Sequence, residues 1–201
     1  MTAGGGVQHS EMFPLLHQDK ENTAELFQIW LNLPKKNKMV AADFQMLWSN
    51  KLPKWTENGA SVTLICGEYK DKKFYEAPKN SWASDPTNEV NIILVKLDQG
   101  AKFQMPKAKG TTNRTLYLFE GKGISLNGEN VTGKKALALD SSHDLSIEAS
   151  SPAVEFLILE AKPIGEPVFQ HGPFAMNTKQ EIFQAIHDYQ QTQFGGWKWI
   201  S

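Results

Sequence analysis

Hydrophobic and polar side chains alternate with a period of two along most of this chain, which is the spacing of β-strands with one buried face. Asn127-Gly128 follows one of the apolar runs and is a strong signal for a tight hairpin turn. Short strands at this spacing, separated by glycine, asparagine and aspartate, predict a closed β-barrel or sandwich. The candidate strands cover residues 26–33, 61–66, 90–97, 115–120, 124–126, 135–139, 145–148 and 154–159.

A helical pattern occurs only near the end of the chain. Thr178 and Glu181 have the spacing of a capping box, with Thr178 as the N-cap. We expect the helix behind them to dock on the barrel and to end at Gly195-Gly196. Trp197 and Trp199 then alternate like an edge strand or close over a groove, and both interpretations stay open. The apolar stripe of this helix consists of Ile182, Phe183, Ile186 and Tyr189.

Length and composition narrow the class of protein. The 201 residues amount to about one and a third domains of roughly 150 residues. A content of 40% hydrophobic and 21% charged residues excludes disordered, collagen-like and coiled-coil chains. The formal net charge of -1 gives no basic face for direct nucleic-acid binding. No run approaches the roughly 20 apolar residues of a membrane span, so we expect no membrane partner.

Cysteine usage and the first residues bear on the cellular compartment. The single cysteine, Cys66, ends the apolar run 62–66, which predicts a buried free thiol. Met1 to Gly6 has neither the basic region nor the apolar core of a secretory signal. We therefore expect a reducing, cytoplasmic compartment.

Among the five histidines, only His9 has a chemically suggestive neighbour. If residues 6–13 form a strand, His9 and Glu11 project from the same face, because side chains at i and i+2 do so. An imidazole beside a carboxylate is half of a site for Fe, Mn, Ni, Cu or Zn. The same pattern is typical of surface strands, and that alternative stays open. The preceding Gly4-Gly5-Gly6 run indicates a tight backbone approach or a bend, not a phosphate cradle.

Three stretches of the sequence resemble the pirin family. Residues 2–12 match its signature stretch, and residues 26–33 with 38–40 match a second motif. The most specific match is 166–178, which leads into the predicted helix. The motifs occur in the family's order, and the likeness runs from Met1 to about Tyr189.

The resemblance implies an all-β bicupin, with two cupin-type β-barrels and a C-terminal α-helix packed across them. Its first barrel holds one non-haem iron through three histidines and one glutamate, of which one histidine and the glutamate match His9 and Glu11. The other two histidines form a His-x-His motif, which this chain lacks. The first barrel is therefore expected to be incomplete.

The expected domain division follows from this reading. Residues 1–45 are the remnant of the metal-binding barrel, and 46–58 are a linker. Residues 59–175 are the second barrel, which is metal-free in the family, and 176–201 are the helix and tail that pack back on the barrels. The run from Lys35 to Lys38 predicts a solvated turn near the boundary.

The resemblance implies a quercetin 2,3-dioxygenase-type oxidoreductase that uses Fe(II), or another divalent metal, and O2 to cleave a flavonol. His9 would be a metal ligand, and Glu11 both a ligand and the catalytic base for the 3-hydroxyl. Without His-x-His, we expect low metal occupancy and weak or absent activity for this chain alone.

Two alternatives stay open. One is a metal- or redox-gated partner of transcription regulators or metabolic enzymes, and the other is a truncated product without function. A misassigned start codon, a disrupted gene or a genuine short form would each explain the incomplete barrel. In each case the open strand edges of residues 1–45 should need a second copy, or the C-terminal helix, to cover them.

Overall fold

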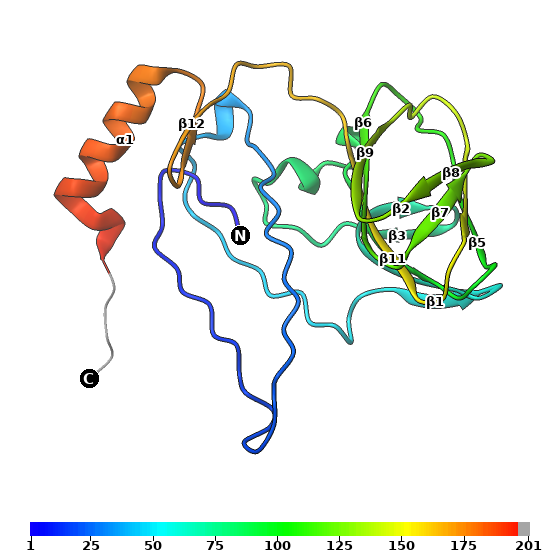
Figure 1. The fold of residues 1–201 in the computed structure, drawn as a ribbon. Coiled ribbons are helices and arrows are strands. Elements are labelled where there is room, and N and C mark those ends of the chain that lie inside the picture. Colours follow the sequence, from blue (N-terminus) through cyan, green and yellow to red (C-terminus); the bar gives the residue numbers. More distant parts are fainter. Residues whose placement is uncertain (197–201) are drawn as a thin grey trace. The chain divides into compact units, whose positions relative to one another are not determined.

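The computed structural model describes residues 1–196, so the prediction for Trp197 and Trp199 lies outside the described residues. The chain forms two compact units (Figure 1). The barrel unit is Phe44–Ile164, and the terminal unit joins residues 1–43 to the described residues from Gly165 onward. The domain boundaries predicted at residues 45, 58 and 175 are not tested by these two units, so they stay predictions.

Two antiparallel sheets build the barrel unit, and they confirm the predicted all-β fold class with one C-terminal helix. Two short 3-10 helices, Trp82–Ser84 and Pro86–Asn88, precede strand β4 (Asn91–Leu97). The first sheet has the order β1-β2-β4-β11-β6-β9, with β3 also paired to β2, and the second has the order β5-β10-β7-β8. The strands of the first sheet are β1 (Lys54–Glu57), β2 (Ala60–Tyr69), β3 (Lys72–Phe74), β4 (Asn91–Leu97), β6 (Asn113–Glu120), β9 (Lys135–Leu139) and β11 (Val154–Ala161). Those of the second are β5 (Lys102–Met105), β7 (Gly123–Leu126), β8 (Glu129–Thr132) and β10 (Leu145–Ala149).

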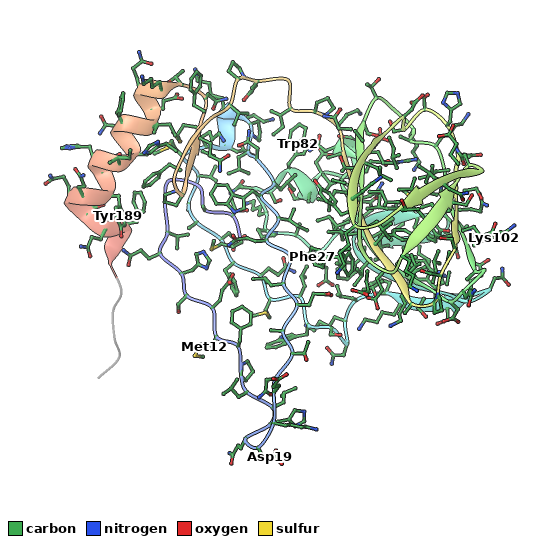
Figure 2. All side chains as sticks on the ribbon, viewed as in Figure 1. Met12, Asp19, Phe27, Trp82, Lys102 and Tyr189 are labelled. Atoms are coloured by element: carbon green, nitrogen blue, oxygen red, sulfur yellow. The ribbon has the colours of Figure 1, made fainter. Side chains whose placement is uncertain are left out.

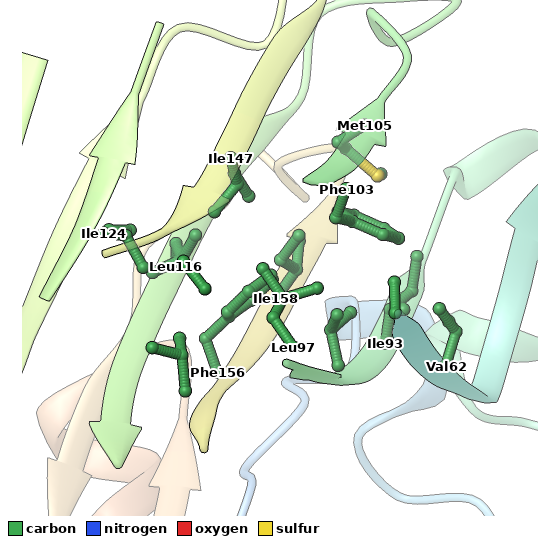
Figure 3. Packing of buried hydrophobic residues seen from close by; sticks show 14 of the residues in the cluster. Val62, Ile93, Leu97, Phe103, Met105, Leu116, Ile124, Ile147, Phe156 and Ile158 are labelled. Atoms are coloured by element: carbon green, nitrogen blue, oxygen red, sulfur yellow. The ribbon is translucent and has the colours of Figure 1, made fainter. Parts of the chain in front are cut away.

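Alternating side chains from both sheets form the core between them (Figure 3). The period of two explains this arrangement, because every second residue of a strand points to the same face. The fully buried members include Leu64, Ile93, Val95, Leu97, Leu116, Ile124, Ile147, Val154, Phe156 and Ile158. The predicted strands from 61–66 onward therefore all occur, and the apolar positions in their alternating pattern mark the buried face of each strand.

The hairpin signal at Asn127-Gly128 is also confirmed. Both residues have positive φ, 49° and 90°, which a two-residue turn between β7 and β8 requires. The Asn127 backbone N–H donates to the Ser146 carbonyl at 2.8 Å, and the Ser146 N–H donates to Asn127 Oδ1 at 2.7 Å. The turn is thereby tied to the next strand of its sheet, β10.

A charged pair is buried in the first sheet, and most of its polar atoms have partners, although Arg114 Nη1 has none among residues 1–196. The Arg114 guanidinium donates from Nε to the Glu160 carboxylate, with both side chains almost completely buried. Arg114 Nη2 also donates to the Pro106 carbonyl at 2.7 Å, and Asn91 Nδ2 donates to Glu160 Oε1 at 2.9 Å. These contacts join β4, β6 and β11. Cys66 is a buried free thiol, as predicted, and burial raises its pKa to about 11.

The terminal unit corrects two strand predictions. Residues 6–13 and 26–33 are not strands; among the described residues of this unit only β12 (Phe169–His171) and β13 (Phe174–Met176) are, and they pair with each other. The physical reason is the lack of a partner, since a strand needs a neighbour for its backbone N–H and C=O groups. An isolated bridge joins Thr2 to Asp43, and a 3-10 helix covers Lys35–Asn37.

The helix α1 (Lys179–Thr192) has the predicted capping box: Thr178 Oγ1 accepts from the Glu181 N–H, and the Glu181 carboxylate accepts from the Thr178 N–H. It ends three residues before the expected Gly195-Gly196, because Gln193 adopts a left-handed backbone and a 3-10 helix, Gln193–Gly195, follows. Within the terminal unit α1 packs on the β12–β13 hairpin, where Tyr189 contacts Phe174 edge to face at 6.2 Å. Its docking on the barrel stays a prediction.

The alternation in β6 can be tested by a pair of neighbouring substitutions. Leu116 is completely buried and Tyr117, on the opposite face, is 38% exposed. Leu116→Ala should lower the free energy of unfolding by about 2–5 kcal/mol, because it removes buried methyl groups and leaves a cavity. Tyr117→Ala should cost less than about 1 kcal/mol. Urea unfolding followed by circular dichroism measures both, and equal losses would contradict the assignment of the two faces.

Candidate functional site

His9 and Glu11, the predicted ligands, lie on the extended segment that follows the glycine run. Both side chains are exposed. Neither makes a side-chain hydrogen bond or an ion pair with any of the residues 1–196. The segment has no regular secondary structure, so the argument that a strand would place them on one face does not apply here. Their assignment as metal ligands stays a prediction.

The residues just before His9 are held firmly. The Gly5 N–H donates to the Val40 carbonyl at 2.9 Å, and a Cβ added at Gly4 would lie 2.0 Å from that same oxygen. Gly4 also has a φ of 53°, which favours glycine. The glycine run therefore permits a close backbone approach, one of the two interpretations that the sequence left open.

Aromatic rings from the C-terminal segment complete this anchor. A Cβ at Gly6 would lie 2.6 Å from the ring of Phe194. That ring packs on Tyr189 at a centroid distance of 5.4 Å, and the Tyr189 hydroxyl accepts a hydrogen bond from Gln8 Nε2 at 3.2 Å. The anchor ends at Gln8. Beyond it the exposed side chains begin, including Met12 (Figure 2).

The donor set at this site has the right chemistry for a divalent metal but only half of the required number. Imidazole and carboxylate are ligands that iron and related metals accept. Among residues 1–196, however, no group of three or more histidine, cysteine, aspartate or glutamate side chains is placed to hold a metal ion. His143 is occupied elsewhere, with Nδ1 2.9 Å from the carboxylate of Asp140. The described residues therefore do not form a complete metal site.

Lys38 is a buried charged residue that the sequence reasoning missed. Lys35 and Lys36 of the expected solvated turn are exposed, but Lys38 at its end is only 6% exposed, and its ammonium donates to Asn32 Oδ1. Burial lowers the pKa of Lys38, and the carboxylates of Glu166 and Glu181 only partly offset that effect. One signal in the sequence could have indicated this contact, because Lys38 lies in one pirin-like motif and Glu166 lies in another.

Glu166 and Asn177 connect those two motifs. The Lys35 N–H donates to Glu166 Oε2 at 2.5 Å, and Asn177 Nδ2 donates to the same oxygen at 3.2 Å. Asn177 Nδ2 also donates to the Pro167 carbonyl at 3.0 Å. The stretch 166–178 thus connects the chain around Lys35 to the residues just before α1.

The sequence profile described as the pirin C-terminal cupin domain matches residues 92–195. The chain belongs to the pirin family. A pirin-like protein of Solanum lycopersicum is 36% identical over 94% of this chain and 62% of its own length. Pirin of Mus musculus is 35% identical over 97% of this chain and 64% of its own. A crystal structure of quercetin 2,3-dioxygenase from Acinetobacter baumannii aligns with a TM-score of 0.70 at 29% identity, covering 82% of this chain and 55% of that one.

These likenesses confirm the cupin-type fold of a pirin. They also show how much of a pirin is present, since the chain spans less than two thirds of the length of these curated relatives. Glu166, Asn177 and Glu181 lie inside the matched range 92–195, whereas His9 and Glu11 lie outside it. Within residues 1–196, no helix is both long and apolar enough to cross a membrane.

The buried ammonium of Lys38 should make the stability of the terminal unit depend on pH. Its pKa in the folded chain is below the 10.5 of an unfolded lysine. Between these two values the unfolded chain binds a proton that the folded chain does not, so rising pH favours folding. In Lys38→Met this rise should be absent, whereas in Lys36→Met, at an exposed neighbour, it should persist.

Urea unfolding followed at the methyl resonances of Thr178 and Ile182, from neutral pH to 10.5, measures this dependence. Titrating groups shared by the two variants cancel in their comparison. A pH dependence that Lys38→Met leaves unchanged would contradict the burial of a charged lysine at this position.

Proposed function

We propose that this chain is the larger part of a metal-dependent pirin of the quercetin 2,3-dioxygenase type. The observation that carries the proposal is the likeness to a quercetin 2,3-dioxygenase of known structure at 29% identity. In the proposal His9 and Glu11 contribute two ligands to Fe(II), or to another divalent metal. The remaining ligands, a His-x-His pair, are absent from this sequence and would have to come from another segment of polypeptide.

Within this proposal Glu11 also acts as the base. Its carboxylate is exposed and has no hydrogen-bond partner among residues 1–196, so it is free to accept a proton. Removing the proton from the 3-hydroxyl of a flavonol would raise the electron density of the ring that reacts with O2. The anchored residues up to Gln8 would limit the positions that the adjacent His9 can take.

A second candidate is protein binding by the terminal unit. The apolar side chains of Met12, Leu15 and Leu16 are 91%, 76% and 82% exposed, and large exposed apolar surfaces mark interaction sites. A metal-gated interaction would need His9 and Glu11, whereas a purely apolar one would not.

The dioxygenase proposal predicts that metal binding and quercetin turnover both depend on the complete ligand set. For the present chain with Fe(II), O2 and quercetin, elemental analysis should find well under one metal per chain, and quercetin should disappear at nearly the uncatalysed rate. A chain extended at its N-terminus by a segment carrying the His-x-His pair should bind one metal and turn over. In that extended chain Glu11→Gln should lower the rate by about 10²–10⁴-fold.

His17→Ala is the matched control, because His17 is an exposed histidine of the same segment with no expected ligand role. Full metal loading of the extended chain without quercetin turnover would contradict the dioxygenase proposal. Equal losses in Glu11→Gln and His17→Ala would contradict the role of Glu11.

The binding candidate predicts concentration-dependent association of the chain in sedimentation velocity. If the interaction is apolar, Leu16→Ser should weaken it, while the double variant His9→Ala, Glu11→Gln should not. If it is gated by metal, the double variant should abolish the effect of added Fe(II). Association that neither variant changes would rule out this part of the terminal unit as the binding surface.

A further inference from the structure

Residues 26–33 have the pattern of a β-strand but no neighbouring strand among residues 1–196 (Figure 1). The segment contains no proline, glycine or charged residue, and its isoleucine and aromatic side chains favour an extended chain. Within the described part of the chain, the backbone N–H and C=O groups of residues 28–33 make no hydrogen bonds. A row of such unpaired groups is a template for pairing with another strand.

Exposed apolar side chains accompany this unpaired backbone. Leu26, Ile29 and Trp30 are 60%, 38% and 53% exposed. The C-terminal end of the segment is anchored, because Asn32 Oδ1 accepts a hydrogen bond from the buried Lys38. The segment is therefore held at one end while its apolar side chains remain in contact with water.

The segment is complementary to itself when two copies run antiparallel. A two-fold axis at Trp30 places residues that are equally far before and after Trp30 opposite each other, so every contact occurs twice. Residues paired in this way lie on the same face of the two strands, where their side chains interact. The pairs are apolar with apolar and amide with amide: Ile29 with Leu31, Phe27 with Leu33, Gln28 with Asn32, and Trp30 with its own copy.

The charges at the two ends of the segment also match in this arrangement. Glu25 precedes the segment and Lys35 follows it, and both residues are exposed. Neither forms a salt bridge with any of residues 1–196, although Lys35 attracts Glu181 from a longer distance. An antiparallel pair places Glu25 of each copy near Lys35 of the other, whereas a parallel pair would place like charges side by side.

The same residues favour one register over its neighbours. Moving the two-fold axis by one residue in either direction would place Trp30 opposite an amide side chain. It would also separate Glu25 from Lys35 of the second copy. The axis at Trp30 therefore satisfies the apolar and the charged positions together.

We propose that residues 26–33 form an interface between two copies of this chain, as an antiparallel pair of strands with Trp30 on the two-fold axis. Each copy supplies the neighbouring strand that the other lacks. A single pair of strands is only marginally stable, so the association is reversible and occurs at micromolar to millimolar concentrations. The interface needs no metal and does not include Met12, Leu15 or Leu16, so it rests on neither function proposed above.

Sedimentation velocity and hydrogen exchange of the full chain, with a chelator present, test the proposal at increasing protein concentration. The sedimentation coefficient should rise from that of a monomer towards that of a dimer. The amides of residues 28–33 should become protected in step with it, because pairing covers their backbone groups. Absence of association up to millimolar chain would overturn the proposal. Protection at all concentrations would also overturn it, since the neighbour would then lie within the same chain.

Two tryptophan variants make the test specific to this segment. Trp30→Lys should weaken association at least about 10-fold, because it places two positive charges at the axis. Trp48→Lys is the matched control and should leave association unchanged, because Trp48 is 59% exposed but lies outside residues 26–33. Both positions are at the surface, so both variants should fold. Equal losses in the two variants, or a loss that only Leu16→Ser produces, would overturn the proposed interface.

Two charge reversals test the antiparallel register. Glu25→Lys and Lys35→Glu should each weaken self-association at least about 4-fold, because symmetry brings like charges together at two sites. An equimolar mixture of these two variants should associate about as strongly as the unmodified chain, since each lysine then meets a glutamate. A mixture that associates no better than either variant alone would overturn the register. Neither metal nor quercetin enters this experiment, so its outcome is independent of the dioxygenase proposal.

Discussion

A β-strand persists only if its backbone N–H and C=O groups meet those of a neighbour, and this pairing requirement explains the difference between the two units of the chain. In the barrel unit every strand has a partner; β2 pairs with β1, β3 and β4, and β11 lies between β4 and β6. In the terminal unit residues 26–33 have the same alternating pattern, and residues 6–13 were also expected to form a strand, but neither segment has a neighbouring strand among residues 1–196. Their apolar side chains therefore stay exposed, as at Leu26 and Trp30.

The sequence predicts local structure well because the decisive signals are local. The range 135–139 was predicted as a strand and is β9, and the turn at Asn127-Gly128 and the capping box at Thr178 occur where their motifs stand. The hairpin of β12 and β13 was not predicted, because its strands of three residues are too short for a periodic signal.

Non-local features could not be read from the sequence. Residues 26–33 failed as a strand because pairing depends on segments distant in the sequence, which periodicity does not report. Lys38 failed as a solvated residue for a similar reason, since Glu166 and Glu181 approach it from more than a hundred residues away. The candidate ligands His9 and Glu11 came from a short motif together with a family resemblance, and geometry alone would not have identified them.

The same pairing requirement bears on the candidate metal ligands. The proposed quercetin 2,3-dioxygenase-type chemistry needs a complete ligand set, but the two candidate ligands stand on an unpaired segment and would supply only half of one. In the barrel unit, in contrast, every strand is paired, and side chains of both sheets form one buried core. The most specific family motif, 166–178, holds the terminal unit together through Glu166 and Asn177.

Hydrogen exchange of the backbone amides tests the central claim most directly, because it measures strand pairing itself. In the chain alone the amides of β2, β4, β6 and β11 should exchange slowly, whereas those of residues 9–13 and 28–31 should exchange at nearly the rate of an unfolded chain. Strong protection of residues 9–13 and 28–31 in the monomer would show that these segments are paired strands, and it would contradict the account given for both His9 and Glu11.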